Sequence, residues 1–299
     1  MDGWGGAARG QRAQRSSACR RVALFALGGL WVAAPVAAQL TGDTLRTDTL
    51  RAAEVSARLA RPPGIADLEL LGRSALHALT TPARWDGDEW LLLPVAGAGL
   101  VALTILDDDG RDLMRRNQSE GLTAFTTDFE RLGTIDNFGL LAGFYAAGLI
   151  FDDAKARAVA AEGMASALIA GGLITPTLQW VTGRSRPRAS DDPYTLDAFS
   201  RNISFPSGHT THAFAVASVI ATEYDALWVK AAAYGLASAV GLCRMYDDAH
   251  YLSDVTAAAL IGTLVGRSVA RFGKKQRGAL EVRPLLAPGA AGAGLTFRF

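Results

Sequence analysis

The segment GMASALIAGGLITPTLQWV, residues 163 to 181, indicates the class of this fold. It consists almost entirely of Ala, Gly, Leu, Ile and other apolar or small residues, with one proline and no charged side chain. A run of this length favours an α-helix, because buried strands are shorter and richer in β-branched and aromatic side chains. The sequence therefore predicts that this segment is helical.

The same pattern recurs on both sides of this segment. From these runs we expect an all-α fold, a bundle of about six core helices. An amphipathic stretch, Leu122 to Leu132, adds a further candidate helix, and the charged residues Asp107 to Asp109 are interpreted as the solvated end of the first one. The other apolar runs are Trp90 to Leu106, Phe138 to Phe151, Ala213 to Ala221, Ala231 to Cys243 and Val255 to Gly266.

The overall composition is that of a folded chain without a nucleic-acid partner. Its 299 residues are 49% hydrophobic and 20% charged, with a formal net charge of +1. This is too apolar for a disordered chain, and the balanced charge leaves no basic surface for nucleic acid. Cys19 and Cys243 lack the spacing of a disulfide framework or a zinc site. No protein partner, metal or cofactor is implied.

Residues 1–38 have the features of a signal peptide. Five arginines precede a short apolar stretch, and Val36-Ala37-Ala38 fits the small-residue pattern that signal peptidase accepts. We expect cleavage before Gln39 and export to a bacterial cell envelope. An uncleaved membrane anchor is the alternative, but about a dozen apolar residues are too few to span a bilayer.

The remaining chain divides into three parts. Residues 39–79 contain a linker and an N-terminal helix, residues 80–272 form the helical domain, and residues 273–299 are a C-terminal tail. The tail has two short strand-like stretches around a turn rich in Gly and Ala, Pro288 to Gly294. This pattern predicts a terminal β-hairpin.

The sequence does not decide whether the helices lie in a membrane or form a water-soluble bundle. Most apolar runs have roughly 10 to 17 residues, whereas a membrane span needs about 20. Two G-x-x-x-G patterns, Gly139 to Gly143 and Gly262 to Gly266, permit the close helix contacts found in membranes. A membrane bundle and a water-soluble bundle of mutually buried helices are both compatible with this pattern.

Side chains typical of phosphate chemistry gather between Gln179 and Asp254. Arginine offers paired donors to phosphoryl oxygens, and neutral histidine can attack phosphorus or transfer a proton. Ser207 and Gly208 precede an apolar helix, so a hydroxyl and free N–H groups are expected at a helix N-terminus, where anions bind. His250 and Asp254 are four residues apart, which pairs a candidate nucleophile with a carboxylate that orients it.

These residues form a pattern that resembles type 2 phosphatidic acid phosphatases (PAP2) and the related vanadium haloperoxidases. The pattern of that family is K-x6-R-P, then P-S-G-H, then S-R-x5-H-x3-D. The resemblance covers residues 80 to 270, in matching order and spacing. The matching positions are Gln179-x6-Arg186-Pro187, Pro206-Ser207-Gly208-His209 and Cys243-Arg244-x5-His250-x3-Asp254.

The resemblance implies a role for each matching position and implies no metal. His250 is the expected nucleophile, which forms a phosphohistidine, and His209 protonates the leaving oxygen. Asp254 is expected to position His250. The expected phosphate-binding residues are Arg186, Ser207, Gly208, Arg244 and Gln179.

Two positions depart from the family pattern. Gln179 stands where the family has lysine, so one positive charge on the phosphate is missing. Arg184 could reach inward and compensate for that charge. Cys243 stands where the family has serine, and we expect it to support packing beside Arg244.

The sequence thus predicts a metal-independent phosphatase for phosphomonoesters or pyrophosphates, with a lipid or small-molecule phosphate as substrate. We expect its active site on the periplasmic side of the inner membrane. A soluble periplasmic acid phosphatase on small esters is the main alternative. A vanadium haloperoxidase is less compatible with the missing lysine, and a catalytically weak module that binds lipid phosphate would not need His209, His250 and Asp254.

Overall fold

The computed structural model describes residues 63–84, 86–129, 135–278, 280–287 and 290–297. The predicted signal peptide, its cleavage before Gln39 and most of the predicted linker lie outside the described residues. A two-stranded C-terminal unit and the helical bundle are separate compact units, and each is treated by itself.

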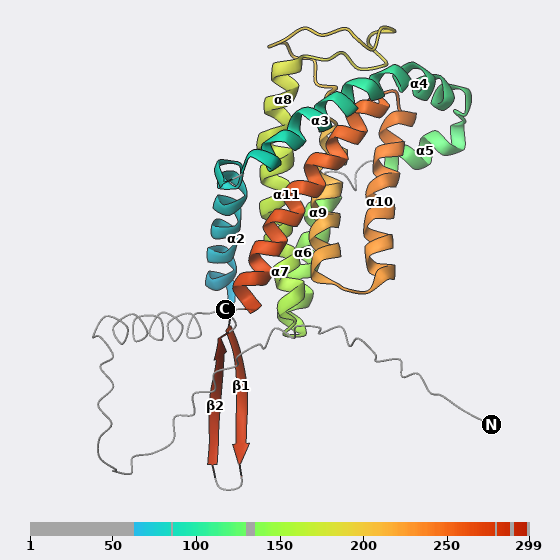
Figure 1. The fold of residues 1–299 in the computed structure, drawn as a ribbon. Coiled ribbons are helices and arrows are strands. Elements are labelled where there is room, and N and C mark those ends of the chain that lie inside the picture. The colour runs from blue at the N-terminus through green and yellow to red at the C-terminus, as the bar shows by residue number, and fades with distance from the viewer. Residues whose placement is uncertain (1–62, 85, 130–134, 279, 288–289, 298–299) are drawn as a thin grey trace, which may run out of the picture. The chain divides into compact units, whose positions relative to one another are not determined.

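Helices make up the bundle, and the apolar runs of the sequence lie within them except for Phe151, which follows the end of α6 (Figure 1). Helices α2, α4 and α5 accompany the predicted core helices. The α-helices are α2 (Pro63–Thr80), α3 (Gly87–Leu103), α4 (Asp107–Arg116), α5 (Glu120–Phe129), α6 (Ile135–Ile150), α7 (Ala154–Ala167), α8 (Thr175–Thr182), α9 (Gly208–Glu223), α10 (Leu227–Tyr246) and α11 (Leu252–Gly278).

The segment 163–181 belongs to a longer helical stretch with a widened middle. It begins at α7, where the Asp153 carboxylate accepts hydrogen bonds from the backbone N–H groups of Lys155 and Ala156 and caps the helix. A π-helical segment, η4 (Leu168–Ile174), then joins α7 to α8. A Cβ on Gly171 would collide with the His212 ring of α9, so glycine lets the wider turn lie against that ring.

Small residues allow the central helices to approach closely. Val159 of α7, Val219 of α9 and Ala270 of α11 are fully buried together. A Cβ on Gly262 or Gly266 would run into the α9 backbone, so this G-x-x-x-G pattern is a backbone-to-backbone contact of α11 with α9. The other pattern has no such role, because a Cβ on its two glycines would meet nothing within 4 Å.

The prediction for Asp107 to Asp109 was wrong at its first residue. The chain does not turn there; it passes through a short 3-10 segment (Thr104–Leu106) and continues as α4. Asp108 and Asp109 are exposed, but Asp107 is fully buried because Arg184 and Ser253 supply partners for its carboxylate.

Among the residues that the structure describes, three helical segments are long and apolar enough to cross a membrane, judged by length and composition. They are Trp90–Arg116, Ala154–Thr182 and Leu252–Arg277. The most apolar window of the second is 72% buried in the bundle, whereas that of the first is only 6% buried. Helix α3 therefore presents large apolar side chains to its surroundings, including Leu91, Leu92 and Val95.

The C-terminal unit is an antiparallel strand pair, as the tail pattern predicts. Strand β1 (Leu280–Ala287) pairs with β2 (Ala290–Phe297), and Leu280 lies opposite Phe297. The second strand begins inside the Gly- and Ala-rich stretch assigned to the turn, because small residues do not prevent ladder pairing.

Candidate active site

The three parts of the motif meet at one end of the bundle. Helices α8 and α10 end there and α11 begins there, beside α4 and α5 (Figure 1). The start of α9 joins them, because the Ser207 N–H donates to the Asp254 carbonyl oxygen at 3.2 Å. The loop after α8 reaches the same place, where the Arg188 N–H donates to the Asp248 carbonyl oxygen at 3.1 Å.

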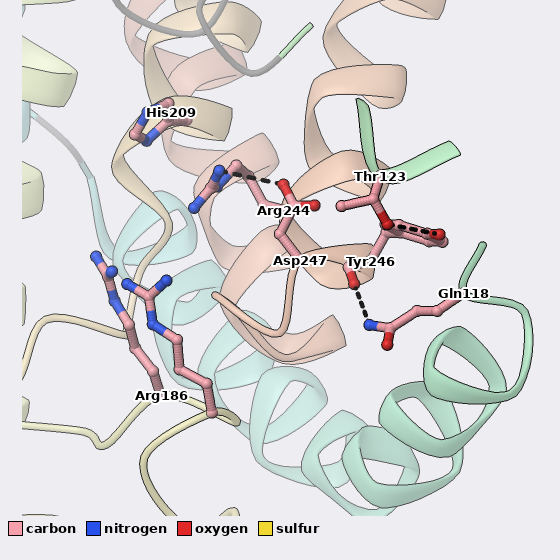
Figure 2. Close-up of a pocket in the computed structure, with 8 residues that line it drawn as sticks. Gln118, Thr123, Arg186, His209, Arg244, Tyr246 and Asp247 are labelled. Atoms are coloured by element: carbon pink, nitrogen blue, oxygen red, sulfur yellow. Dashed lines mark hydrogen bonds and ion pairs between the residues drawn. The ribbon is translucent and has the colours of Figure 1, made fainter. Parts of the chain in front are cut away.

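A pocket of about 580 Å³ opens at this end. Figure 2 shows the guanidinium groups of Arg186 and Arg244 and the His209 ring around one space. Among the described residues, no group of three His, Cys, Asp or Glu side chains is placed to hold a metal ion. The residues that line the pocket are Gln118, Thr123, Arg186, Arg188, His209, Arg244, Tyr246 and Asp247.

Arg186 is a half-buried cation with unused hydrogen-bonding capacity. Its Nε lacks a hydrogen-bond partner in the part of the chain that the structure describes. Burial lowers the pKa of Arg186, and the nearby Arg188 guanidinium lowers it further. An anion in the pocket would oppose both effects, because it would accept from the unused donor and balance the two charges.

Arg244 faces Arg186 but already has an acidic neighbour. Its Nη1 lies 3.4 Å from the Asp247 carboxylate, which also lines the pocket. The Thr126 hydroxyl donates to that same carboxylate at 2.7 Å and holds it in place. A phosphate that binds Arg244 must therefore compete with Asp247 for the guanidinium.

His209 lies in the first turn of α9, on the pocket wall. Burial lowers its pKa to about 4, and the neighbouring His250, His212 and Arg186 contribute in the same direction. Without a bound anion, His209 is thus neutral at physiological pH. A phosphate would favour the protonated ring, because an anion close to an imidazole raises its pKa.

Ser207 and Gly208 contribute to the site through the backbone. The Ser207 side chain is fully buried, and its hydroxyl lies 3.0 Å from that of Thr210 rather than on the pocket wall. Helix geometry leaves the first N–H groups of α9 without an intrahelical acceptor, which makes the N–H groups after Ser207 candidate phosphate donors. The predicted contact from the Ser207 hydroxyl is not favoured by this geometry.

His250 is buried and held in one defined tautomer. Its side chain is almost fully buried, and Nδ1 lies 2.7 Å from the Ser204 carbonyl oxygen. A carbonyl can only accept, so Nδ1 must carry the hydrogen and Nε2 keeps the lone pair. Burial lowers the pKa of His250, with Asp254 acting in the opposite direction, so burial favours the neutral ring that keeps this lone pair.

The sequence expected Asp254 to accept the Nδ1 proton directly, but Ser204 is the nearer acceptor. The Asp254 carboxylate lies 3.8 Å from Nδ1. The spacing of four residues does not give a regular helical pair here, because His250 precedes α11 and only Asp254 lies on it. Asp254 instead acts through charge and by binding the Ser204 hydroxyl at 2.6 Å.

The two remaining polar positions of the first motif point away from the pocket. Gln179 donates its amide hydrogens to the carbonyl oxygens of Pro206 and Ile203, at 2.9 and 3.3 Å. It therefore shapes the loop before α9, and this geometry does not favour a phosphate contact. Arg184 does not replace the missing charge either, because its guanidinium is bound to Asp254 and Asp107. Cys243 is buried, as expected for a packing role.

The sequence missed the wall of the pocket formed by α5 and the end of α10. The Gln118 side chain donates to the Tyr246 carbonyl oxygen at 2.9 Å (Figure 2). The Ser119 N–H donates to the Tyr246 hydroxyl at 2.7 Å. Arg188 was detectable from its position two residues after Arg186, whereas the others carried no local signal.

Comparisons with known proteins find one matching family model and a related phosphatase sequence. Residues 161–277 match the sequence model of the PAP2 superfamily. Over 181 residues the chain is 32% identical to the lipid A 1-phosphatase of Porphyromonas gingivalis, an alignment that covers 58% of this chain and 36% of the relative. The chain thus spans about a third of the length of that relative.

Two solved structures are also similar. The crystal structure of Aquifex aeolicus LpxE matches with 24% identity and a TM-score of 0.43, over 56% of this chain and 95% of that one. The transmembrane PAP2-type phosphatidylglycerolphosphate phosphatase from Bacillus subtilis matches with 20% identity and a TM-score of 0.48, over 62% and 94%.

The family match covers the region that builds most of the pocket. Arg186, His209, Arg244 and the buried His250 all lie within residues 161–277, whereas Gln118 and Thr123 lie before them. Over residues 161–277, the chain is therefore similar to the PAP2 superfamily.

Proposed function

We propose that this protein is a lipid phosphatase that removes a phosphate from a phosphomonoester or pyrophosphate through a phosphohistidine, without a metal ion. One observation carries the proposal. A pocket has three arginines and His209 on its wall, and His209, Arg186 and Arg244 all lie close enough to His250 to interact with it electrostatically. The Nδ1 of His250 is bound to the Ser204 carbonyl oxygen, which leaves the lone pair on Nε2. This combines an anion site, an acid and a nucleophile in one place.

The residues divide the reaction into two steps. In the first, the Nε2 lone pair of His250 forms a bond to phosphorus, the phosphorus–oxygen bond to the leaving group breaks, and His209 gives that oxygen a proton. In the second, His209 takes a proton from water, the water oxygen attacks phosphorus, and the phosphorus–nitrogen bond breaks to release phosphate. Arg186 and Arg244 stabilise the charge that the phosphoryl oxygens carry in both transition states.

Several exposed apolar surfaces support a lipid as the carrier of the phosphate. Helix α3 leaves its large apolar side chains uncovered, in one of three segments suited to span a membrane. At the pocket end, Trp180 is 56% exposed and packs edge-on against Phe199, which is 62% exposed. Aromatic side chains of this kind are enriched where a membrane meets water. The similarity to a lipid A 1-phosphatase is in line with a lipid phosphate.

This arrangement also supports a place in the cell envelope. An exported chain with membrane-spanning helices would bring its pocket to the periplasmic surface of the inner membrane, where lipid phosphates are accessible. We expect the full chain to remain with membranes after carbonate washing. Recovery in the soluble periplasmic fraction without detergent would favour the alternative, an acid phosphatase for small esters.

The decisive experiment measures phosphate release by the purified full chain in detergent with excess EDTA. The panel contains lipid A 1-phosphate, phosphatidylglycerol phosphate, phosphatidate, an isoprenyl pyrophosphate and p-nitrophenyl phosphate. We expect release from at least one lipid substrate, inhibition by vanadate, and preference over the small ester. Loss of activity in EDTA that magnesium or zinc restores, or release from the small ester alone, would contradict the proposal.

A further inference from the structure

Asp107 is a buried carboxylate far from the motif in sequence but close to it in space. It is the first residue of α4 and is fully buried. One of its oxygens accepts from the Ser253 N–H at 2.8 Å, and the other accepts from the Ser253 hydroxyl at 2.6 Å. The second oxygen also binds Arg184 Nη2 at 2.7 Å. Asp107 therefore contacts the residue directly before Asp254.

Arg184 lies between two carboxylates. Its Nη1 binds Asp254 at 2.7 Å while its Nη2 binds Asp107 at the same distance. The remaining donor, Nε, goes to the Pro193 carbonyl oxygen, and the guanidinium lies over the Tyr251 ring. One positive charge is thus shared by two negative ones, and the group as a whole carries a net charge of −1.

This charge balance matters because burial prevents water from screening it. The exposed fraction is 4% for the Arg184 side chain and zero for those of Asp107 and Asp254. With Asp107 present, the negative charge of Asp107 balances the positive charge of Arg184, so the negative charge of Asp254 is not cancelled. With a neutral group at position 107, Arg184 would cancel the charge of Asp254 and leave the group with no net charge.

His250 is the residue that responds to this field. Cations face it from three elements: Arg186 from the loop, Arg244 from α10 and, when protonated, His209 from α9. Asp254 on α11 opposes them, and Asp247 partly offsets Arg244. When His250 bonds to phosphorus its ring becomes positively charged, so a net negative group behind it lowers the energy of that state.

We infer that Asp107 is a positioning residue of the active site, whose charge balances Arg184 so that Asp254 supports a positively charged His250. This inference rests on the proposed role of His250 as the nucleophile. It extends the site to α4, outside the segment that matches the family.

The test compares Asp107→Asn with Asp108→Asn in the full chain in detergent. Asn has the shape of Asp, and Asp108 is the exposed neighbour whose ion pair with Arg111 lies at the surface. We expect Asp107→Asn to lower kcat by about tenfold to a hundredfold with KM changed by less than about threefold, because a transition-state interaction is lost. The acid limb of the pH profile of kcat/KM should move to lower pH, since removal of a negative charge lowers the pKa of His250.

A readout that does not depend on turnover separates this inference from the proposed function. Nitrogen NMR of the histidine-labelled chain follows the protonation of His250 directly. At the pH of half-protonation in wild type, Asp107→Asn should hold less of the cation, and Asp107→Asn with Arg184→Gln should restore it. An unchanged His250 protonation in Asp107→Asn would overturn the inference, even if activity falls. If wild type releases no phosphate, the proposed function fails while the NMR comparison still decides the role of Asp107.

Discussion

Arg184 and Arg186 are separated by one residue, yet they lie in opposite environments. Every nitrogen of the Arg184 guanidinium donates a hydrogen bond, and although burial lowers its pKa, Asp254 and Asp107 outweigh that effect and raise it. Arg186 has an unpartnered Nε within the described structure and a lowered pKa. The comparison teaches that unused donors, rather than residue type, distinguish an arginine that binds a ligand from one that holds the fold.

The same contrast separates the two histidines of the motif. His250 is fixed by the Ser204 carbonyl on the side of the buried charges, whereas His209 lies on the pocket wall. In the proposed reaction, the buried side supplies a nucleophile of defined tautomer. The open side supplies groups whose charge changes when a phosphate binds.

The largest expected effect tests the buried side. His250→Ala should abolish measurable phosphate release, because it removes the nitrogen that is proposed to form the bond to phosphorus. His77→Ala is the matched control, since His77 stacks on Phe272 rather than lining the pocket. Single-turnover assays measure both. Retention of more than about a tenth of wild-type activity by His250→Ala would contradict the nucleophile assignment.

The next effect tests the open side and depends on pH. His209→Asn should lower kcat/KM by about 100-fold to 10,000-fold, the usual contribution of a general acid. The free His209 has a pKa of about 4 and must be protonated to act, so wild-type kcat/KM should fall as pH rises above that value. His250 acts when neutral, so it does not cause this decline. The profile of His209→Asn should lack it, and a persistent decline would assign the acid to another group.

Substitutions of Arg186 and Arg184 should have different effects: the first should lower activity, and the second should lower the stability of the fold. Arg186→Met should lower kcat/KM by about 100-fold to 1,000-fold, because a stabilising cation of the transition state is lost. Its unfolding temperature should not fall, since methionine replaces a buried donor that lacks a partner among the described groups.

Arg184→Met is the counterpart of that variant. It leaves Asp107 and Asp254 as unpaired buried carboxylates, which should cost about 3–5 kcal/mol in the free energy of unfolding. Thermal and denaturant unfolding of both variants measures the difference. Equal destabilisation by the two substitutions would remove the distinction between a ligand-binding and a structural arginine.

The smallest expected effect concerns the departure from the family pattern. Gln179→Lys should hold kcat/KM within about threefold of wild type or raise it, because lysine keeps donors for the Pro206 and Ile203 carbonyls and adds a charge near α9. A drop of tenfold in a folded variant would mean that the amide geometry itself is required. Steady-state kinetics with the preferred lipid substrate measures this effect.

The amino-acid sequence by itself determined the helical class and the motif. Apolar runs and capping residues act over a few neighbouring positions, so the helices were predictable from local pattern. The spacing of the motif identified Arg186, His209 and His250 without knowledge of the packing, and the structure gathers them at one end of the bundle. Their catalytic roles stay predictions until the variants are measured.

Only the tertiary structure decided how these groups are partnered. Asp107 and Arg184 are 77 residues apart, and no local pattern shows that they share a buried ion pair. The choice of Ser204 over Asp254 as acceptor for His250 depends on where α11 begins relative to the loop before α9. The sequence indicated a solvated Asp107 because a charged residue after an apolar run is usually exposed. Its burial and its partners Arg184 and Ser253 come from contacts between segments that are distant in the sequence, and only the packing of the chain creates those contacts.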